Sequence, residues 1–150
     1  MKKQLNVSAI KEGTVIDHIP TTALFKVISI LKLDQCKDMV TFGNNLDSNV
    51  MGGKAIIKVA NRFFKDKEIN KIALVAPHAK LNTIKDYEVV EKYVVEIPDE
   101  IHDIVRCFNP KCITNHENID THFEVISKSP VALKCRYCEK ITHQDQMEIK

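Results

Sequence analysis

Four of the five cysteines of this 150-residue chain form two close pairs near its C-terminus. Cys107 and Cys112 enclose four residues, and Cys135 and Cys138 enclose two. A tetrahedral zinc ion needs four ligands at about 2.0–2.3 Å, and two short loops can supply two thiolates each. The spacing therefore predicts one zinc ion per chain in a closed, structural site, with two disulfides or a redox Cys-x-x-C motif as the alternatives.

Other residue types that could carry chemistry form no enzyme motif. The chain has only four glycines, and it contains no phosphate-cradling loop, no nucleophile elbow and no His-Glu-x-x-His. The sequence therefore predicts no catalytic residue. Four histidines of the cysteine region could replace a cysteine as metal ligands, but with four cysteines at suitable spacing they are expected on the surface: His102, His116, His122 and His143. Cys36 is expected to be a free thiol without a role.

Charge divides the chain into two parts. Residues 1–97 contain 15 lysines and arginines against 11 acidic residues, whereas residues 98–150 contain 7 against 9. Zinc modules that bind nucleic acid use a basic face to neutralise phosphates, so an acidic zinc module favours a protein partner. No segment approaches the roughly 18 apolar residues of a membrane helix, and the protein is expected in the cytoplasm with reduced cysteines.

The secondary structure is expected to be α+β. Thr21 or Thr22 is predicted to cap the first helix and Asp66 the second, and residues 44–49 are predicted to form a polar turn. The predicted order of the first part is strand 13–19, a helix with Leu24, Val27, Ile28 and Leu31 on its buried face, strands 39–43 and 54–60, a helix that ends before Pro77, and strands 79–85 and 87–95.

This order predicts a ferredoxin-like α/β sandwich, with one antiparallel sheet and both helices on the same face. Pro98 and the change of charge mark a domain boundary, so the predicted domains are residues 1–97 and 98–150. The second is a small, mainly antiparallel β domain, with strands near 101–106, 123–127, 131–134 and 140–143. About 50 residues bury too small a core to fold unaided, so zinc is expected to supply much of its folding energy.

Lysines on the predicted strands of the first domain allow two interpretations. Asp17 and His18 end one strand, Lys54 and Lys58 share a face of another, and Lys92 lies on a third. Lysines on a strand face usually form a solvated surface. The alternative is an anionic ligand, with ammonium groups at phosphates and a carboxylate at ribose hydroxyls. Spacing alone does not decide whether these side chains converge.

Taken together, these motifs resemble the regulatory chain of aspartate carbamoyltransferase, from about residue 7 to the C-terminus. The resemblance rests on the stretches 13–20, 53–58, 76–77, 82–84, 87–92, 107–113 and 133–140. It implies a non-catalytic subunit whose first domain binds ATP as activator and CTP or UTP as inhibitor, controlling pyrimidine nucleotide biosynthesis. It also implies that regulatory chains pair through that domain, that the zinc domain docks on the catalytic chain, and that three regulatory dimers bridge two catalytic trimers.

The resemblance also implies roles for individual residues. Asp17 would contact the ribose, Lys58 the ribose or base, and Lys92 the phosphates, with His18 close to them. The base pocket would be lined by Val7, Ala9, Ile10, Ile84, Tyr87 and Val89, with Asn82 and Lys54 in the same region.

One position departs from the family. Some members carry a second basic residue two positions after the phosphate lysine, where this chain has Val94. Lys80 lies outside the residues matched to the family. A second function, a free-standing zinc ribbon that binds nucleic acid, is the alternative, and the acidic second domain argues against it.

Overall fold

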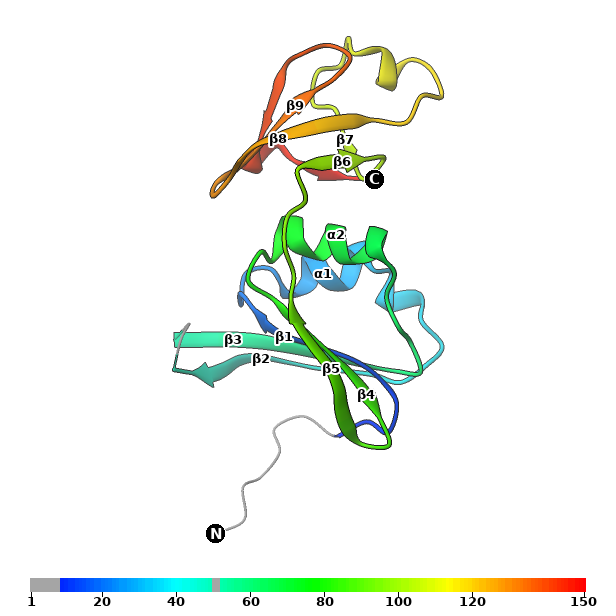
Figure 1. Ribbon diagram of the computed structural model, residues 1–150, viewed down its shortest axis with the longest axis vertical. Coiled ribbons are helices and arrows are strands. Elements are labelled where there is room, and N and C mark those ends of the chain that lie inside the picture. The colour runs from blue at the N-terminus through cyan, green and yellow to red at the C-terminus, as the bar shows by residue number, and fades with distance from the viewer. Residues whose placement is uncertain (1–8, 50–51) are drawn as a thin grey trace. The chain divides into compact units, whose positions relative to one another are not determined.

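The structure is a computed structural model that describes residues 9–49 and 52–150 (Figure 1). The chain divides into two compact units, Met1–Glu96 and Ile97–Lys150. Each unit has its own sheet and its own buried residues, and each is described separately below. The coarse expectation of an α+β chain with mainly antiparallel sheets is confirmed.

The first unit is a five-stranded antiparallel sheet with two helices on one face (Figure 1). The strand order is β2-β3-β1-β4-β5. The elements are β1 (Gly13–Ile19), α1 (Leu24–Ile30), a short 3₁₀ turn (Leu33–Gln35), β2 (Val40–Ser48), β3 (Gly52–Ala60), α2 (Asp66–Val75), β4 (Lys80–Lys85) and β5 (Glu88–Val94).

Alternation along the strands separates a core face from an outer face. In β3, Ile57 and Val59 are fully buried, whereas Ile56 and Lys58 are only partly covered. The helices contribute the buried partners of the core face, namely Leu24, Val27, Ile72, Ala73 and Leu74. Because successive side chains point to opposite faces, the residues between the core positions project from the sheet face that carries no helix.

The sequence predicted a polar turn at residues 44–49. In the structure, most of this run belongs to β2. β2 continues to Ser48, and its register with β3 shifts between Gly43 and Leu46. Asn45 takes a positive φ of 59° there, which asparagine tolerates better than most residues. A bulge therefore carries polar residues through a strand that periodicity alone would end.

The predicted helix caps were wrong by one or two residues. α1 has Ala23 at its N-cap, without a side-chain hydrogen bond, because the chain enters the helix through a turn in which the Ala23 amide donates to the Pro20 carbonyl at 2.8 Å. α2 has Lys65 at its N-cap, and Asp66 is the first helical residue. The Lys65 amide donates to Glu68 Oε1 at 3.3 Å, so an acidic side chain does cap this end.

Two positive-φ residues close the hairpin between β4 and β5. Asp86 and Tyr87 have φ values of 51° and 65°, so Tyr87 lies in the turn rather than in the strand predicted at 87–95. The Tyr87 amide donates to the Lys11 carbonyl at 3.0 Å. This bond holds the segment before β1 against the hairpin turn.

The second unit is built from short antiparallel strands. β6 (Glu100–His102), β8 (His122–Lys128), β9 (Val131–Cys135) and β10 (Ile141–His143) form a sheet in the order β10-β9-β8-β6, and β7 (Val105–Arg106) pairs with β11 (Glu148–Ile149). The strand expected at 101–106 is split, because Asp103 takes a positive φ of 53°. β11 was not predicted from the sequence. Short 3₁₀ turns at Ile113–Asn115 and Gln144–Gln146 complete the unit.

Among the residues that the structure describes, no helix is long and apolar enough to span a membrane.

Candidate functional site

The four paired cysteines converge on one point in the second unit. Their sulfur atoms all lie within 4.8 Å of one another. The Sγ atoms of Cys107 and Cys138 are 3.7 Å apart, as are those of Cys112 and Cys135. Zinc–thiolate bonds of about 2.3 Å in a tetrahedron place sulfurs about 3.8 Å apart, so the cluster has the dimensions of a Cys₄ zinc site. All five cysteines are free thiols, which makes the disulfide alternative wrong.

Both cysteine loops are held by backbone hydrogen bonds. In the first, the Cys112 amide donates to the Asn109 carbonyl at 3.0 Å. Asn115 Nδ2 donates to the carbonyls of Cys107 and Asn109, at 2.9 and 2.8 Å, and ties the loop together. In the second loop, the Glu139 amide donates to the Cys135 carbonyl at 2.9 Å. This role of Asn115 was not predicted, because an asparagine three residues after a cysteine forms no recognisable metal-site motif.

Burial opposes ionisation of the cysteine cluster, so formation of its thiolates depends on a nearby cation. Burial raises the pKa of the Cys107 and Cys135 thiols. Desolvation opposes ionisation of Cys138 as well, but hydrogen bonds, chiefly to Asn109, lower its pKa to about 7. Thr114 Oγ1 donates to Cys112 Sγ at 3.2 Å, a contact that suits a thiolate. Four thiolates at this spacing need a divalent ion, and four sulfur donors with no open position match structural zinc.

The second candidate site lies on the helix-free face of the first unit's sheet. A cavity of about 240 Å³ opens there, lined by Ala9, Ile10, Val15, Ile56, Lys58, Asn82, Ile84, Tyr87 and Val89. Its floor is apolar, since Ile10, Val15 and Ile84 are buried together and Ile56 packs against them. An apolar cavity with a lysine and an amide at its wall suits a flat, polar-edged ligand.

Charged side chains continue along the same sheet face. Lys54 Nζ lies 3.0 and 3.2 Å from the two carboxylate oxygens of Asp17. The His18 amide donates to Asp17 Oδ1 at 2.6 Å, and His18 Nδ1 lies 3.5 Å from the same oxygen. Lys92 is opposite Asn82 in the β4–β5 register, on the side of the sheet that carries the cavity.

Lys80 belongs to this group, although it is not among the residues matched to the family. It is opposite Asp17 in the β1–β4 register and opposite Val94 in the β4–β5 register. Burial is the main cause that lowers the pKa of His18, and the charges of Lys80, Lys54 and Lys92 add to it. This sheet face therefore presents four lysines, Lys54, Lys58, Lys80 and Lys92. The sequence had placed Lys54 and Lys58 on one strand.

The pKa shifts at this face follow from partial burial among cations. Burial is the main cause that lowers the pKa of His18, and Asp17 only partly opposes it. Burial likewise lowers the pKa of Lys58. Burial disfavours ionisation of Asp17, but hydrogen bonds from Lys54 and the His18 amide, with the Lys54 charge, outweigh it and lower the Asp17 pKa. The local field favours an incoming anion.

Two polar atoms at this face are buried without a hydrogen-bond partner among the described residues. They are Asn82 Oδ1 and His18 Nδ1, of which His18 Nδ1 has only the 3.5 Å contact with Asp17 Oδ1. An unsatisfied buried polar atom costs about 1–3 kcal/mol, and a ligand that pairs with it recovers that cost. Both atoms lie beside the lysines, so the face has unfilled capacity for a polar ligand.

Most residues predicted to bind a nucleotide are brought together here. Seven line the cavity, and four more lie in the neighbouring charged group; Val7 lies outside the described residues. Val15 and Ile56 also line the cavity but were not predicted, because aliphatic residues in a strand do not distinguish a binding site from a core.

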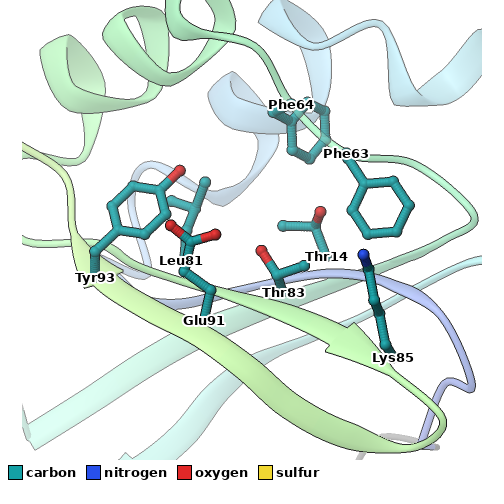
Figure 2. A pocket seen from close by; sticks show the side chains of 8 residues that line it. All are labelled: Thr14, Phe63, Phe64, Leu81, Thr83, Lys85, Glu91 and Tyr93. Carbon is teal, nitrogen blue, oxygen red and sulfur yellow. The ribbon is translucent and has the colours of Figure 1, made fainter.

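A second cavity lies on the opposite, helix-covered side of the same sheet (Figure 2). It measures about 230 Å³ and is lined by Thr14, Phe63, Phe64, Leu81, Thr83, Lys85, Glu91 and Tyr93. Thr14 Oγ1 already donates to the Arg62 carbonyl at 2.7 Å, and Lys85 Nζ lies 6.0 Å from the Phe63 ring centre. With one lysine and one glutamate in its lining, this cavity lacks the excess of positive charge that marks the other face.

Both units match models of one protein family. Residues 5–96 match the aspartate carbamoyltransferase regulatory chain, allosteric domain, and residues 99–148 match the metal binding domain of the same chain. The aspartate carbamoyltransferase regulatory chain of Bacteroides thetaiotaomicron is 54% identical over 148 residues, which cover 99% of this chain and 97% of the relative. That of Pyrococcus abyssi is 52% identical over 146 residues, 96% of each chain. The regulatory chain of Porphyromonas gingivalis is 50% identical over 148 residues, which cover 99% of this chain and 98% of the relative.

Proposed function

Because the chain belongs to the family of aspartate carbamoyltransferase regulatory chains, a non-catalytic subunit, we propose a division of labour between its two domains. Residues 1–97 bind an effector nucleotide, and residues 98–150 hold one structural zinc ion and dock on the catalytic chain. Through the contact between the second domain and the catalytic chain, the bound nucleotide controls pyrimidine nucleotide biosynthesis. ATP is the proposed activator, and CTP and UTP are the proposed inhibitors.

The nucleotide proposal rests on one observation, the apolar cavity bordered by four lysines. Lys92 and Lys80 would contact the phosphates, Asp17 the ribose, and Lys58 the ribose or base. Asn82 Oδ1, which has no hydrogen-bond partner among the described residues, would accept from a base amino group. An ammonium–phosphate contact is a charge-assisted bond, and several of them in a partly desolvated site favour a nucleotide that carries phosphates.

Titration calorimetry of the full chain with ATP and CTP tests this function. Both nucleotides are expected to bind one site and to compete with each other. Adenosine without phosphates should bind at least tenfold more weakly, because it leaves the lysines unpaired. If neither nucleotide binds the wild-type chain, alone or with its catalytic partner, the regulatory proposal is wrong.

The docking proposal rests on the cysteine cluster. A unit of about 50 residues with four buried or half-buried cysteine sulfurs is expected to fold only when zinc is bound. The surface that docks on the catalytic chain would therefore form only in the zinc-bound chain. Co-purification with the catalytic chain is therefore expected to depend on zinc. Removal of zinc with an organomercurial should release the catalytic chain, and an intact complex after removal would contradict the docking role.

Pairing of regulatory chains is proposed at the β2 edge of the described sheet. β2 is an edge strand, and near it Phe25, Met39 and Phe42 are 65%, 56% and 48% exposed. The Phe25 and Phe42 rings meet edge to face at 6.0 Å, which gives a contiguous apolar surface. In sedimentation velocity, Phe42→Glu is expected to convert dimers to monomers, whereas Phe108→Glu in the second unit should not. Three such dimers would bridge two catalytic trimers.

Finer features complete the proposal. The order β2-β3-β1-β4, with helices after β1 and β3, supports a ferredoxin-like first domain to which β5 is added. A reducing compartment such as the cytoplasm suits four free zinc-binding cysteines. Nucleic-acid binding by the second domain is not favoured, because both domains match one regulatory chain in sequence order.

A further inference from the structure

Two of the four histidines of the second unit meet a carboxylate, away from the cysteines. Glu100 and His102 lie two residues apart in β6 and so share a face, and His102 is directly opposite His122 in β8. The two imidazole rings are 4.0 Å apart, centre to centre, and tilted by 31°. One potential ligand atom from each of the three side chains lies within 4.8 Å of the others.

The separations fit a single small cation. His102 Nε2 lies 3.7 Å from Glu100 Oε2, and His122 Nε2 lies 3.5 Å from Glu100 Oε1. Nitrogen and oxygen ligands at about 2.0–2.1 Å are about 3.3–3.4 Å apart around a tetrahedral ion and about 2.8–3.0 Å apart around an octahedral or square-planar one, so shifts of about 0.1–0.9 Å suffice. His122 Nε2 is also shielded from solvent, and beyond its 3.5 Å contact with Glu100 Oε1 it has no hydrogen-bond partner among the described residues.

This cluster is distinct from the cysteine site. Phe123, the neighbour of His122, is opposite Cys135 in the β8–β9 register. Since adjacent side chains of a strand point to opposite faces, His122 and Cys135 lie on different faces of the sheet. The link between them is Arg136, whose amide donates to the His122 carbonyl at 2.9 Å and whose Nη2 donates to Glu100 Oε1 at 2.6 Å.

We propose that Glu100, His102 and His122 bind a divalent transition-metal ion of the imidazole-preferring class, Zn²⁺, Ni²⁺ or Cu²⁺, at a second site on each chain. Two imidazoles and a carboxylate are three ligands, which leaves at least one position for water. The side chains are 44%, 63% and 29% exposed, respectively, so the ion exchanges with solvent. Arg136 competes for the carboxylate, which keeps the site weaker than the cysteine cluster.

Nickel titration of untagged, zinc-loaded full chain tests the proposal. One equivalent of Ni²⁺ is expected to bind while elemental analysis still finds one zinc per chain. In proton NMR, the paramagnetic ion should broaden the ring signals of His102 and His122 before those of His116 and His143. Because this measurement uses the wild-type chain, it does not depend on the folding of any variant.

Substitutions complete the test. His102→Gln and His122→Gln are each expected to weaken Ni²⁺ binding at least tenfold with zinc content unchanged, and His116→Gln and His143→Gln are the matched controls. Arg136→Gln should tighten binding, because it frees Glu100 and removes a nearby positive charge. Absence of a nickel equivalent beyond the zinc, or an equal loss in His143→Gln, would overturn the second site.

Discussion

Lys80 in β4 lies directly opposite Val94 in β5 and, on its other side, directly opposite Asp17 in β1. In the family resemblance, the position of Val94 carries a second basic residue in some members. A residue and its cross-strand partner share one face of a sheet, so Lys80 places a positive charge where Val94 offers none. Lys80 therefore adds a positive charge beside Val94 on the sheet face that carries Asp17.

Lysine substitutions should therefore reduce nucleotide affinity according to the sheet face they occupy. Lys92→Ala is expected to cost about 1.5–3 kcal/mol, roughly a tenfold to hundredfold loss, for a lost bond to a charged group. Lys80→Ala should cost about 1 kcal/mol or more, and Lys58→Ala should also weaken binding. Calorimetry with ATP and CTP measures each loss.

Lys85→Ala is the matched control for these variants. Lys85 is in the same strand as Lys80, but it lines the cavity on the opposite side of the sheet. Its removal should leave affinity unchanged. Equal affinities of wild type and Lys92→Ala would exclude Lys92 from the site, and a Lys80→Ala variant that binds like wild type would exclude Lys80.

The pH dependence of binding should report His18. Its pKa lies below 6.5 in the free chain because of burial and the charges of Lys80, Lys54 and Lys92, with Asp17 opposing. A bound triphosphate adds negative charge and raises this pKa, so binding takes up protons between the free and the bound values. As the pH falls through this range, affinity should rise relative to His18→Asn.

Asparagine suits this comparison, because His18 has a positive φ of 58° and asparagine tolerates that conformation. Calorimetry in buffers of different ionisation enthalpy counts the protons directly. Protonation of the nucleotide itself is common to both proteins, so their difference isolates His18. The same proton uptake in His18→Asn would show that another group titrates.

The stability of the free chain should fall in acid for the same reason. The pKa of His18 is lower in the folded chain than its unfolded value near 6.5, so the unfolded chain binds more protons between the two values. Stability from this group is fully present above about pH 6.5 and decreases as the pH falls towards the folded pKa. Urea denaturation of wild type and His18→Asn between pH 5 and 7.5 should show a smaller decrease in the variant.

Zinc removal should unfold only the second unit. Structural zinc contributes an apparent 10–16 kcal/mol in small metal domains, which exceeds what about 50 residues gain from their core. With a chelator, or in Cys112→Ser, amide NMR signals of β6 to β11 should lose dispersion while those of β1 to β5 persist. Full dispersion in zinc-free protein would mean that the second unit folds without metal.

Gly13→Ala should destabilise the first unit. Gly13 has a φ of 140°, and a Cβ there would lie 2.0 Å from the Val59 carbonyl oxygen of the paired strand. Backbone strain at residue 13 and displacement of the Val59 carbonyl are together expected to lower the free energy of unfolding by at least about 2 kcal/mol. Gly53→Ala, whose Cβ would meet nothing closer than 3.6 Å, is the control. Equal urea midpoints for the two variants would contradict this close approach.

The sequence by itself determined the features that depend on local spacing. Two short loops bring each cysteine pair together, so the spacing of Cys107, Cys112, Cys135 and Cys138 was enough to predict a four-thiolate metal site. Alternation of Ile57 and Val59 with Lys58 likewise gave the faces of β3. Local sequence patterns gave a wrong prediction where pairing with a neighbouring strand prevails. The polar run of β2 was predicted as a turn, but a bulge lets it continue the strand.

Only the tertiary structure decided which distant residues meet. In the sequence, nothing distinguishes Lys80 from other surface lysines. Only the strand register shows that it lies opposite Asp17. His102 and His122 are 20 positions apart and read as unrelated surface histidines until β6 pairs with β8. A one-residue slip of either strand would turn these side chains to the other face, so their contacts depend on register. Register is set by packing over the whole sheet, which no short stretch of sequence encodes.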